Sequence, residues 1–242
     1  MSYIFREHIK QRLAVIAFLI TLTACTSESY DAGDGPNSYL TADLVLLHTS
    51  QDKSVRSALL DDGTTLQFSN PFAQDWLTRP DSVYRALLYY DKTVAASDAA
   101  ASNPTATSIV RARSVRPVSV LRPVEAEDME TLRTDPVGFE SLWMSKNKSY
   151  INLSLLLKSG KTEADDAMHA LGIVSHGTTT DADRRRTLHL TLYHDQGGVP
   201  AYYTVQQYVS IPTQLLEEAD TIELTLNTYN GKKVVKVAVS NL

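Results

Sequence analysis

Short runs of β type dominate the chain from residue 38 onward. Within residues 188–193 and 222–226 the apolar residues occupy alternate positions, the pattern of a strand in a sheet with one solvated face. Further runs of β type occupy residues 41–48, 55–60, 64–68, 83–90, 108–115, 150–157, 167–174, 187–194, 202–208, 221–228 and 233–239. Short strands at this spacing, with no βαβ unit among them, predict an antiparallel all-β chain folded as sandwich or barrel.

Two turn signals predict tight hairpins within this pattern. Asp61-Asp62-Gly63 separates the second and third β-type runs, and Asn230-Gly231 separates the last two. Asp-Gly and Asn-Gly suit two-residue hairpin turns, because Gly and Asn tolerate a positive φ.

Three segments interrupt the strand pattern. Residues 95–106 are small, polar and alanine-rich, which predicts a long surface loop. Residues 116–130 contain two prolines and are expected to cross into a second unit. Asp135 is expected to cap a short helix, because the following proline suits a first turn and the spacing of Phe139, Leu142 and Trp143 places all three on one helical face.

The first 24 residues have the layout of a secretory signal peptide. A cationic head with Arg6, Lys10 and Arg12 precedes an apolar run over residues 13–22. That run is about half the roughly 20 residues that a helix needs to cross a bilayer. We therefore expect cleavage of residues 1–24 rather than a permanent span.

Leu22-Thr23-Ala24-Cys25 resembles the bacterial lipobox, which combines an apolar residue, small residues and an accessible thiol. It predicts cleavage between Ala24 and Cys25 and lipidation of Cys25 by diacylglycerol and fatty acyl chains such as palmitate. The alternative is an ordinary secretory signal in which Cys25 is incidental. Each buried methylene contributes about 0.8 kcal/mol, so lipid on Cys25 would hold the protein at a membrane. We expect the outer membrane, on its periplasmic face or at the cell surface.

The segment behind the lipobox is expected to act as a flexible tether. Residues 25–37 are mostly polar, acidic and glycine-bearing and show no periodicity. Glu28 and Asp31 follow Cys25 closely, a position similar to that of the acidic residues in the export signals of surface lipoproteins.

Net charge argues against one class of partner, and the cysteine content argues against disulfides. Cleavage removes three basic residues and one acidic residue, so the net charge falls from −5 to −7. An acidic body repels phosphate backbones, and nucleic acid is not expected as a partner. Cys25 is the only cysteine, so the exported protein has no intramolecular disulfide.

The histidines do not form a metal-binding pattern. Those that follow the predicted cleavage site are His48, His169, His176, His189 and His194. His189 and His194 are five residues apart, which on a strand points them to opposite faces. The chain has neither HExxH nor a cysteine pair, so we expect no metal and no cofactor.

The sequence also lacks a complete GxSxG nucleophile elbow and a complete EF-hand calcium loop. Residues 172–177 lack the glycine that a GxSxG elbow needs two residues before serine, where Ile173 stands. Asp61-Asp62-Gly63 and residues 181–183 lack the rest of an EF-hand loop, so we interpret them as turns. One enzymatic alternative stays open, a hydrolase with an unfamiliar site built from His176, Asp181 and Asp183.

Two further groups of residues are candidates for binding. Arg111 and Arg113 share a strand face and, with Arg116 and Arg122, form a basic stretch without interleaved aromatic residues. A structural or anion-binding role fits that stretch, and residues 184–186 (RRR) fit a solvated strand edge. A set of tyrosines, Tyr202, Tyr203 and Tyr208, fits either sugar stacking or ordinary strand packing.

Several stretches together identify a family. They are the lipobox, LDDGTTL at residues 60–66, YINL at 150–153, LTLYHDQG at 190–197 and DTIELTLNTYNG at 220–231. With these, the chain resembles the NigD-like family of Bacteroidetes lipoproteins. The alanine-rich residues 95–106 depart from the family pattern.

The resemblance implies an architecture and little about residue roles. It implies an N-terminal OB-like β-barrel, placed here at residues 38–122, and a C-terminal antiparallel β-sandwich at residues 123–242, with one or two short helices. The family takes its name from a gene beside a bacteriocin locus and has no agreed functional residues, so only Cys25 is assigned a role.

We therefore expect a non-enzymatic binding or accessory module, anchored through Cys25, with a glycan or an envelope protein as its ligand. The alternatives are an accessory or immunity role beside a bacteriocin locus, which rests on the family name, and the unfamiliar hydrolase.

Overall fold

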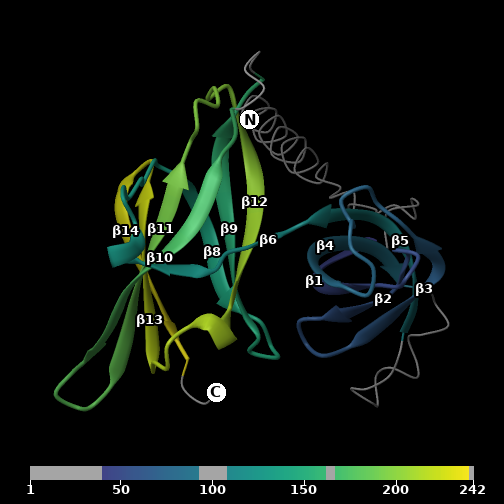
Figure 1. The fold of residues 1–242 in the computed structure, drawn as a ribbon, viewed down its shortest axis with the longest axis horizontal. Coiled ribbons are helices and arrows are strands. Elements are labelled where there is room, and N and C mark those ends of the chain that lie inside the picture. The colour runs from purple at the N-terminus through teal and green to yellow at the C-terminus, as the bar shows by residue number, and fades with distance from the viewer. Residues whose placement is uncertain (1–39, 93–107, 162–166, 240–242) are drawn as a thin grey trace, which may run out of the picture. The chain divides into compact units, whose positions relative to one another are not determined.

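The computed structural model describes residues 40–92, 108–161 and 167–239 (Figure 1). The predicted signal peptide, the Ala24–Cys25 cleavage site, the tether at residues 25–37 and the loop at residues 95–106 lie outside these residues. Within them the chain is almost entirely β, so the predicted fold class is confirmed.

The N-terminal strands close into a five-stranded barrel. Its strands are β1 (Leu40–Thr49), β2 (Val55–Leu60), β3 (Thr65–Phe72), β4 (Val83–Lys92) and β5 (Ser108–Pro117). The strand order is β1-β2-β3-β5-β4, and β1 closes the ring by pairing with β4. Only β3 and β5 pair in parallel. This closed five-stranded barrel is the expected OB-like unit.

Alternating apolar side chains fill the barrel. Val45, Leu47, Ala58 and Leu88 are all fully buried. The predicted hairpin between β2 and β3 is present: Leu60 N–H donates to the Thr64 carbonyl at 2.9 Å. Gly63 adopts a φ of +89°, which favours glycine at this position.

The remaining strands form two sheets around a second core. The five-stranded sheet has the order β14-β13-β11-β10-β7, and the four-stranded sheet has the order β6-β12-β9-β8. The strand bounds are β6 (Ser119–Val120), β7 (Pro123–Glu125), β8 (Gly138–Met144), β9 (Tyr150–Ser159), β10 (Ala170–Thr180), β11 (Arg186–Asp195), β12 (Tyr203–Pro212), β13 (Thr221–Thr228) and β14 (Gly231–Ala238). Side chains of β9 and β12 pack with those of β10, β11 and β13 in one hydrophobic cluster, as in a β-sandwich.

The sandwich is not purely antiparallel, which corrects part of the prediction. Strand β11 pairs with β13 in parallel, as do β10 with β7 and β12 with β6. Sequence neighbours such as β13 and β14 remain antiparallel, and the predicted hairpin between them is present. Its two loop residues are Tyr229 and Asn230, because Gly231 already pairs with Thr228, and of Asn230 and Gly231 only Gly231 has a positive φ, +102°. The parallel pairs join strands that are distant in the chain, and alternation alone does not specify such pairs.

The helix predicted after Asp135 is wrong, because this segment forms strand β8. The register of β8 against β9 shifts between Phe139 and Ser141, so Glu140 is an extra residue in a β-bulge. The bulge places Phe139 and Leu142 against the same core although they are three residues apart. A bulged strand thus reproduces the spacing of a helical face.

The short helices lie elsewhere, at Ala126–Asp128 and Thr213–Leu215, and both are single 3₁₀ turns. The predicted division at residue 122 stays a prediction, although β6, at residues 119–120, already pairs with β12.

Candidate functional site

A buried arginine on β4 joins the barrel to the four-stranded sheet. The Arg85 side chain is 1% exposed, and it donates to the two carboxylate oxygens of Asp61 at 2.5 and 2.7 Å. It also donates to Asn152 Oδ1 on β9 at 3.0 Å and to Ser210 Oγ on β12 at 3.1 Å. The Cζ atom of its guanidinium lies over the Tyr150 ring, 4.3 Å from the ring centre. One side chain therefore holds three segments together.

Asn152 completes these contacts, and we call Asp61, Arg85, Asn152 and Ser210 the Arg85 network. The Asn152 amide donates to Asp61 Oδ2 at 3.1 Å, and its carbonyl oxygen accepts from the Ser210 hydroxyl at 2.7 Å. The backbone adds a bond of 2.7 Å from Asn147 N–H to the Asp61 carbonyl. A buried ion pair is favourable only when hydrogen bonds satisfy its remaining atoms, and the Arg85 network meets that condition.

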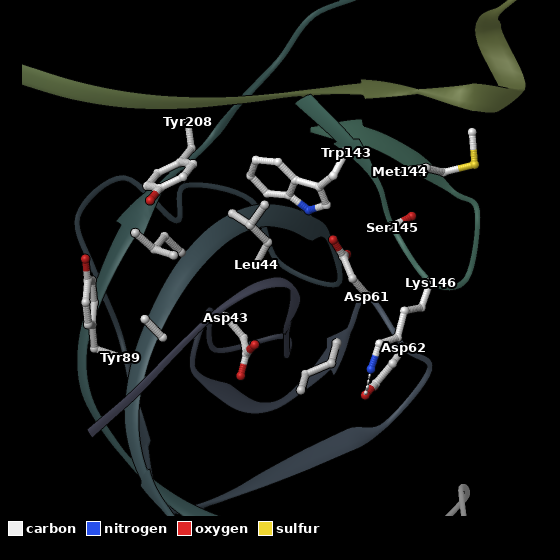
Figure 2. Close-up of a pocket in the computed structure, with 13 residues that line it drawn as sticks. Asp43, Leu44, Asp61, Asp62, Tyr89, Trp143, Met144, Ser145, Lys146 and Tyr208 are labelled. Carbon is white, nitrogen blue, oxygen red and sulfur yellow. Dashed lines mark ion pairs between the residues drawn. The ribbon is translucent and has the colours of Figure 1, made fainter. Parts of the chain in front are cut away.

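A cavity of about 380 Å³ opens beside the Arg85 network. Strands β1, β2 and β4 line it from the barrel, and β8 and β12 line it from the sheet. We call it the seam cavity, and the side chains that give it its chemistry are Asp43, Asp62, Tyr89, Trp143, Lys146 and Tyr208 (Figure 2). Its volume lies in the range of roughly 300–1,000 Å³ that is typical of small-molecule sites.

Aromatic rings form one side of the seam cavity. Trp143 and Tyr208 meet edge to face, with ring centroids 6.4 Å apart and an interplanar angle of 82°. Figure 2 shows the two rings beside each other, with Tyr89 on the barrel. No hydrogen bond to another described residue engages the Trp143 indole N–H or the hydroxyls of Tyr89 and Tyr208. These groups are free to bind a ligand.

Carboxylates supply the polar side. Asp43 Oδ2 accepts from the Tyr90 hydroxyl at 2.8 Å; burial and this bond raise the pKa of Tyr90, which therefore stays a donor. Partial burial raises the pKa of Asp62, but the Thr64 donors and the Lys146 charge outweigh this effect, so that its pKa is lowered. Lys146 Nζ lies 4.0 Å from Asp62 Oδ2. Asp62 is thus a carboxylate at neutral pH.

Two histidines of the sandwich, His169 and His194, form a pair that their spacing in the sequence did not predict. His169 Nδ1 lies 2.9 Å from His194 Nε2, and the rings are stacked with centroids 5.2 Å apart. His194 Nδ1 lies 2.9 Å from the Asp135 carbonyl, so Nδ1 carries the proton and Nε2 accepts from His169. His169 Nε2 is buried without a partner. Burial and the neighbouring His194 lower the pKa of His169.

The residues of the alternative hydrolase site have separate local partners. His176 Nε2 lies 2.9 Å from Thr191 Oγ1 on the neighbouring strand. Asp181 Oδ1 accepts from the backbone N–H groups of Asp183 and Arg185 and so shapes the tip of the β10–β11 hairpin. Asp181 and Asp183 are thus joined through the loop backbone, but no hydrogen bond or ion pair among the described residues links His176 to either of them.

The structure separates the tyrosines that the sequence grouped. Tyr208 lines the seam cavity, whereas Tyr202 and Tyr203 are 79% and 50% exposed. The predicted basic stretch is exposed on β5 and beyond it, where Arg113 is paired with Asp91. His189 and His194 do point to opposite faces of β11, as expected.

The described residues include no group of three His, Cys, Asp or Glu side chains that could hold a metal ion. Cys25 and Ala24 lie outside them, so their assigned roles stay predictions. No helix in residues 40–92, 108–161 or 167–239 has the length and hydropathy needed to cross a bilayer.

Of the residues that line the seam cavity, sequence reasoning proposed only Tyr208 for binding and missed the others. Asp61 was interpreted only as a turn residue, and Trp143 was assigned to a helical face. No local signal links Asp61 to Arg85 and Asn152, because these residues are 24 and 91 positions away in the chain.

Comparisons with known proteins agree with this architecture. Residues 120–239 match the model of the NigD-like C-terminal beta sandwich domain. No curated protein matches the chain in a sequence search.

Several solved structures share the fold. A NigD-like immunity protein from Bacteroides caccae is 22% identical, with a TM-score of 0.58 over 81% of this chain and 91% of that one. A protein of unknown function from Bacteroides vulgatus is 16% identical, with a TM-score of 0.58 over 83% and 92% of the two chains. A provisionally named lipoprotein from Bacteroides fragilis is 14% identical, with a TM-score of 0.57 over 84% and 99%. Residues 120–239 therefore belong to the family of NigD-like C-terminal beta sandwich domains, and the chain shares its fold with a NigD-like protein.

Proposed function

We propose that this protein is a lipid-anchored envelope protein that binds a ligand, without catalysis, in the seam cavity. The observation that carries the proposal is the cavity itself, where unpartnered aromatic groups face carboxylates across a junction fixed by the Arg85 network. Because the cavity walls are already held in place, little conformational entropy is lost when a ligand binds, and this favours a binding role for the seam cavity.

The chemistry of the cavity favours binding over proton transfer. Asp61 is engaged with Arg85, Asp43 with Tyr90, and Asp62 lies near Lys146, so each carboxylate already has a structural partner. A general base must lie close to the reacting proton and have a pKa near the working pH. The lowered pKa of Asp62 is opposite to that need.

The proposed anchor is lipid on Cys25, with the outer membrane as its location. The lipobox at residues 22–25 supports this, as does the shared fold with a provisionally named lipoprotein. Replacing Cys25 by Ser in the full chain should abolish acylation and retain the uncleaved mass. Ser29→Ala is the matched control and should be acylated and cleaved to the same extent as the parent. Unaltered processing in Cys25→Ser would contradict the anchor.

Binding is tested by capture from envelope extracts. The chain without residues 1–25 keeps every described residue and serves as bait, beside Trp143→Ala and Tyr208→Ala. Tyr202→Ala is the control, because Tyr202 is an exposed tyrosine that precedes β12 and does not line the cavity. We expect one ligand to be retained by the parent and by Tyr202→Ala and lost by both cavity variants. Capture that is equal in all four proteins would contradict the seam cavity as the site.

A second candidate is an accessory or immunity role, because one structure with the same fold is named a NigD-like immunity protein. Deleting the gene and measuring killing of neighbours and self-protection tests this role. If the parent gene restores killing and self-protection and the Trp143→Ala gene does not, the immunity role depends on the seam cavity. Unchanged killing and protection would remove it.

A further inference from the structure

We infer that the seam cavity takes a saccharide of one or two sugar rings, an inference that rests on the proposed binding function. The first argument is size and shape. A volume of about 380 Å³ is at the small end of ligand sites, which suits one or two rings rather than a long chain. The rings of Trp143 and Tyr208 offer apolar surface to the C–H faces of a pyranose.

The second argument is the mixture of donors and acceptors. A sugar hydroxyl donates and accepts, so its site needs both kinds of group close together. The Trp143 indole N–H and the Lys146 ammonium donate, while the carboxylates of Asp43 and Asp62 accept. The hydroxyl of Tyr208 does both. Free polar groups set between aromatic rings match a polyol better than an apolar ligand.

The third argument is charge. Asp43, Asp61 and Asp62 stand against Arg85 and Lys146, which leaves one net negative charge at the cavity. This surplus disfavours a phosphate or other anion. Because two of the three carboxylates already have cationic partners, a cationic ligand finds only Asp43 without one. A neutral polyol has neither cost.

Isothermal titration calorimetry tests the inference on the full chain in mild detergent. The probes are glucose, galactose, mannose, N-acetylglucosamine and their common disaccharides, with spermidine as a cationic probe and sodium phosphate as an anionic probe. The variants are Trp143→Ala, Trp143→Phe and Asp43→Asn, with Tyr202→Ala as the control. Thermal melting of each variant separates loss of binding from loss of fold.

We expect at least one sugar to bind the parent and Tyr202→Ala equally. Trp143→Ala should raise the Kd for that sugar about tenfold or more, as expected for a central aromatic contact. Asp43→Asn should raise this Kd to a smaller extent. Trp143→Phe keeps a ring and loses the N–H, so it should fall between the parent and Trp143→Ala.

Two outcomes overturn the inference. One is binding of spermidine or phosphate, dependent on Trp143, with no sugar bound; this would leave the proposed binding function standing with another ligand. The other is no Trp143-dependent binding of any sugar in folded proteins. The proposed function itself fails only if envelope capture is also independent of Trp143 and Tyr208, so the two failures are distinguishable.

Discussion

Removing the negative charge of Asp61 should weaken both the stability of the chain and the coupling between barrel and sandwich. In Asp61→Asn, the Arg85 guanidinium stays buried, 1% exposed, without a counter-charge. Breaking a buried ion pair from one side typically costs about 3–5 kcal/mol. The Asp61 side chain is 20% exposed, and water there screens part of the effect. We therefore expect a loss of about 3 kcal/mol in the free energy of unfolding, at the lower end of that range.

Urea unfolding followed by tryptophan fluorescence measures this loss. Trp76 packs edge to face with Tyr84 in the barrel, and Trp143 lies on β8 of the sheet. Single-tryptophan versions, Trp76→Phe and Trp143→Phe, therefore report on the two units separately. The transitions should coincide in the parent chain and separate in Asp61→Asn, because the Arg85 network no longer couples the units.

Glu218→Gln is the matched control. Glu218 pairs with Arg186 at 3.1 Å, but its side chain is 88% exposed, so its loss should cost less than about 1 kcal/mol. The reasoning is refuted if Asp61→Asn costs no more than this control, or if the two tryptophan transitions still coincide.

Three further predictions concern the sandwich. First, the lowered pKa of His169 means that the unfolded chain binds more protons near the ordinary value of 6.5, so stability is lost as the pH falls through and below 6.5. The melting temperature of the parent should therefore fall more between about pH 7.5 and about pH 5.5 than that of His169→Asn, and equal falls would contradict the His169–His194 pairing. Second, Leu153 is fully buried, and Leu153→Ala should lower the free energy of unfolding by about 2–5 kcal/mol in urea titrations, with the exposed Leu215→Ala as control. Third, Gly197 has a φ of +59°, and a Cβ there would lie 2.1 Å from the Met168 carbonyl oxygen. Gly197→Ala should lower the melting temperature clearly, whereas Gly198→Ala, which meets no atom within 4 Å, should lower it less.

Local patterns in the sequence were enough to predict most of the strands. Strands β11 and β13 alternate regularly between buried and partly exposed residues, and the turn at Gly231 has the positive φ that its dipeptide implied. Such features depend on neighbours in the chain, and their physical causes are visible in a short window of sequence.

The errors arose where a distant contact overrides the local pattern. The bulge at Glu140 gave a strand the spacing of a helix, and only its register with β9 distinguishes the two. The parallel pairing of β11 with β13 likewise joins strands separated by β12.

The candidate site was the least predictable part. Asp61 is an ordinary turn residue by sequence, and its role depends on Arg85 from another strand and Asn152 from the sandwich. Likewise, Trp143 reaches the seam cavity because β8 is a strand rather than a helix. Spacing could not identify the His169–His194 pair, because β10 and β11 align the two only through their pairing.

The position of a bound ligand tests the central claim most directly. A crystal structure of the protein with the ligand captured from envelope extracts should show that ligand in the seam cavity, in contact with Trp143 and Tyr208. Clear density for the ligand at another surface, with the seam cavity free of it, would contradict the account.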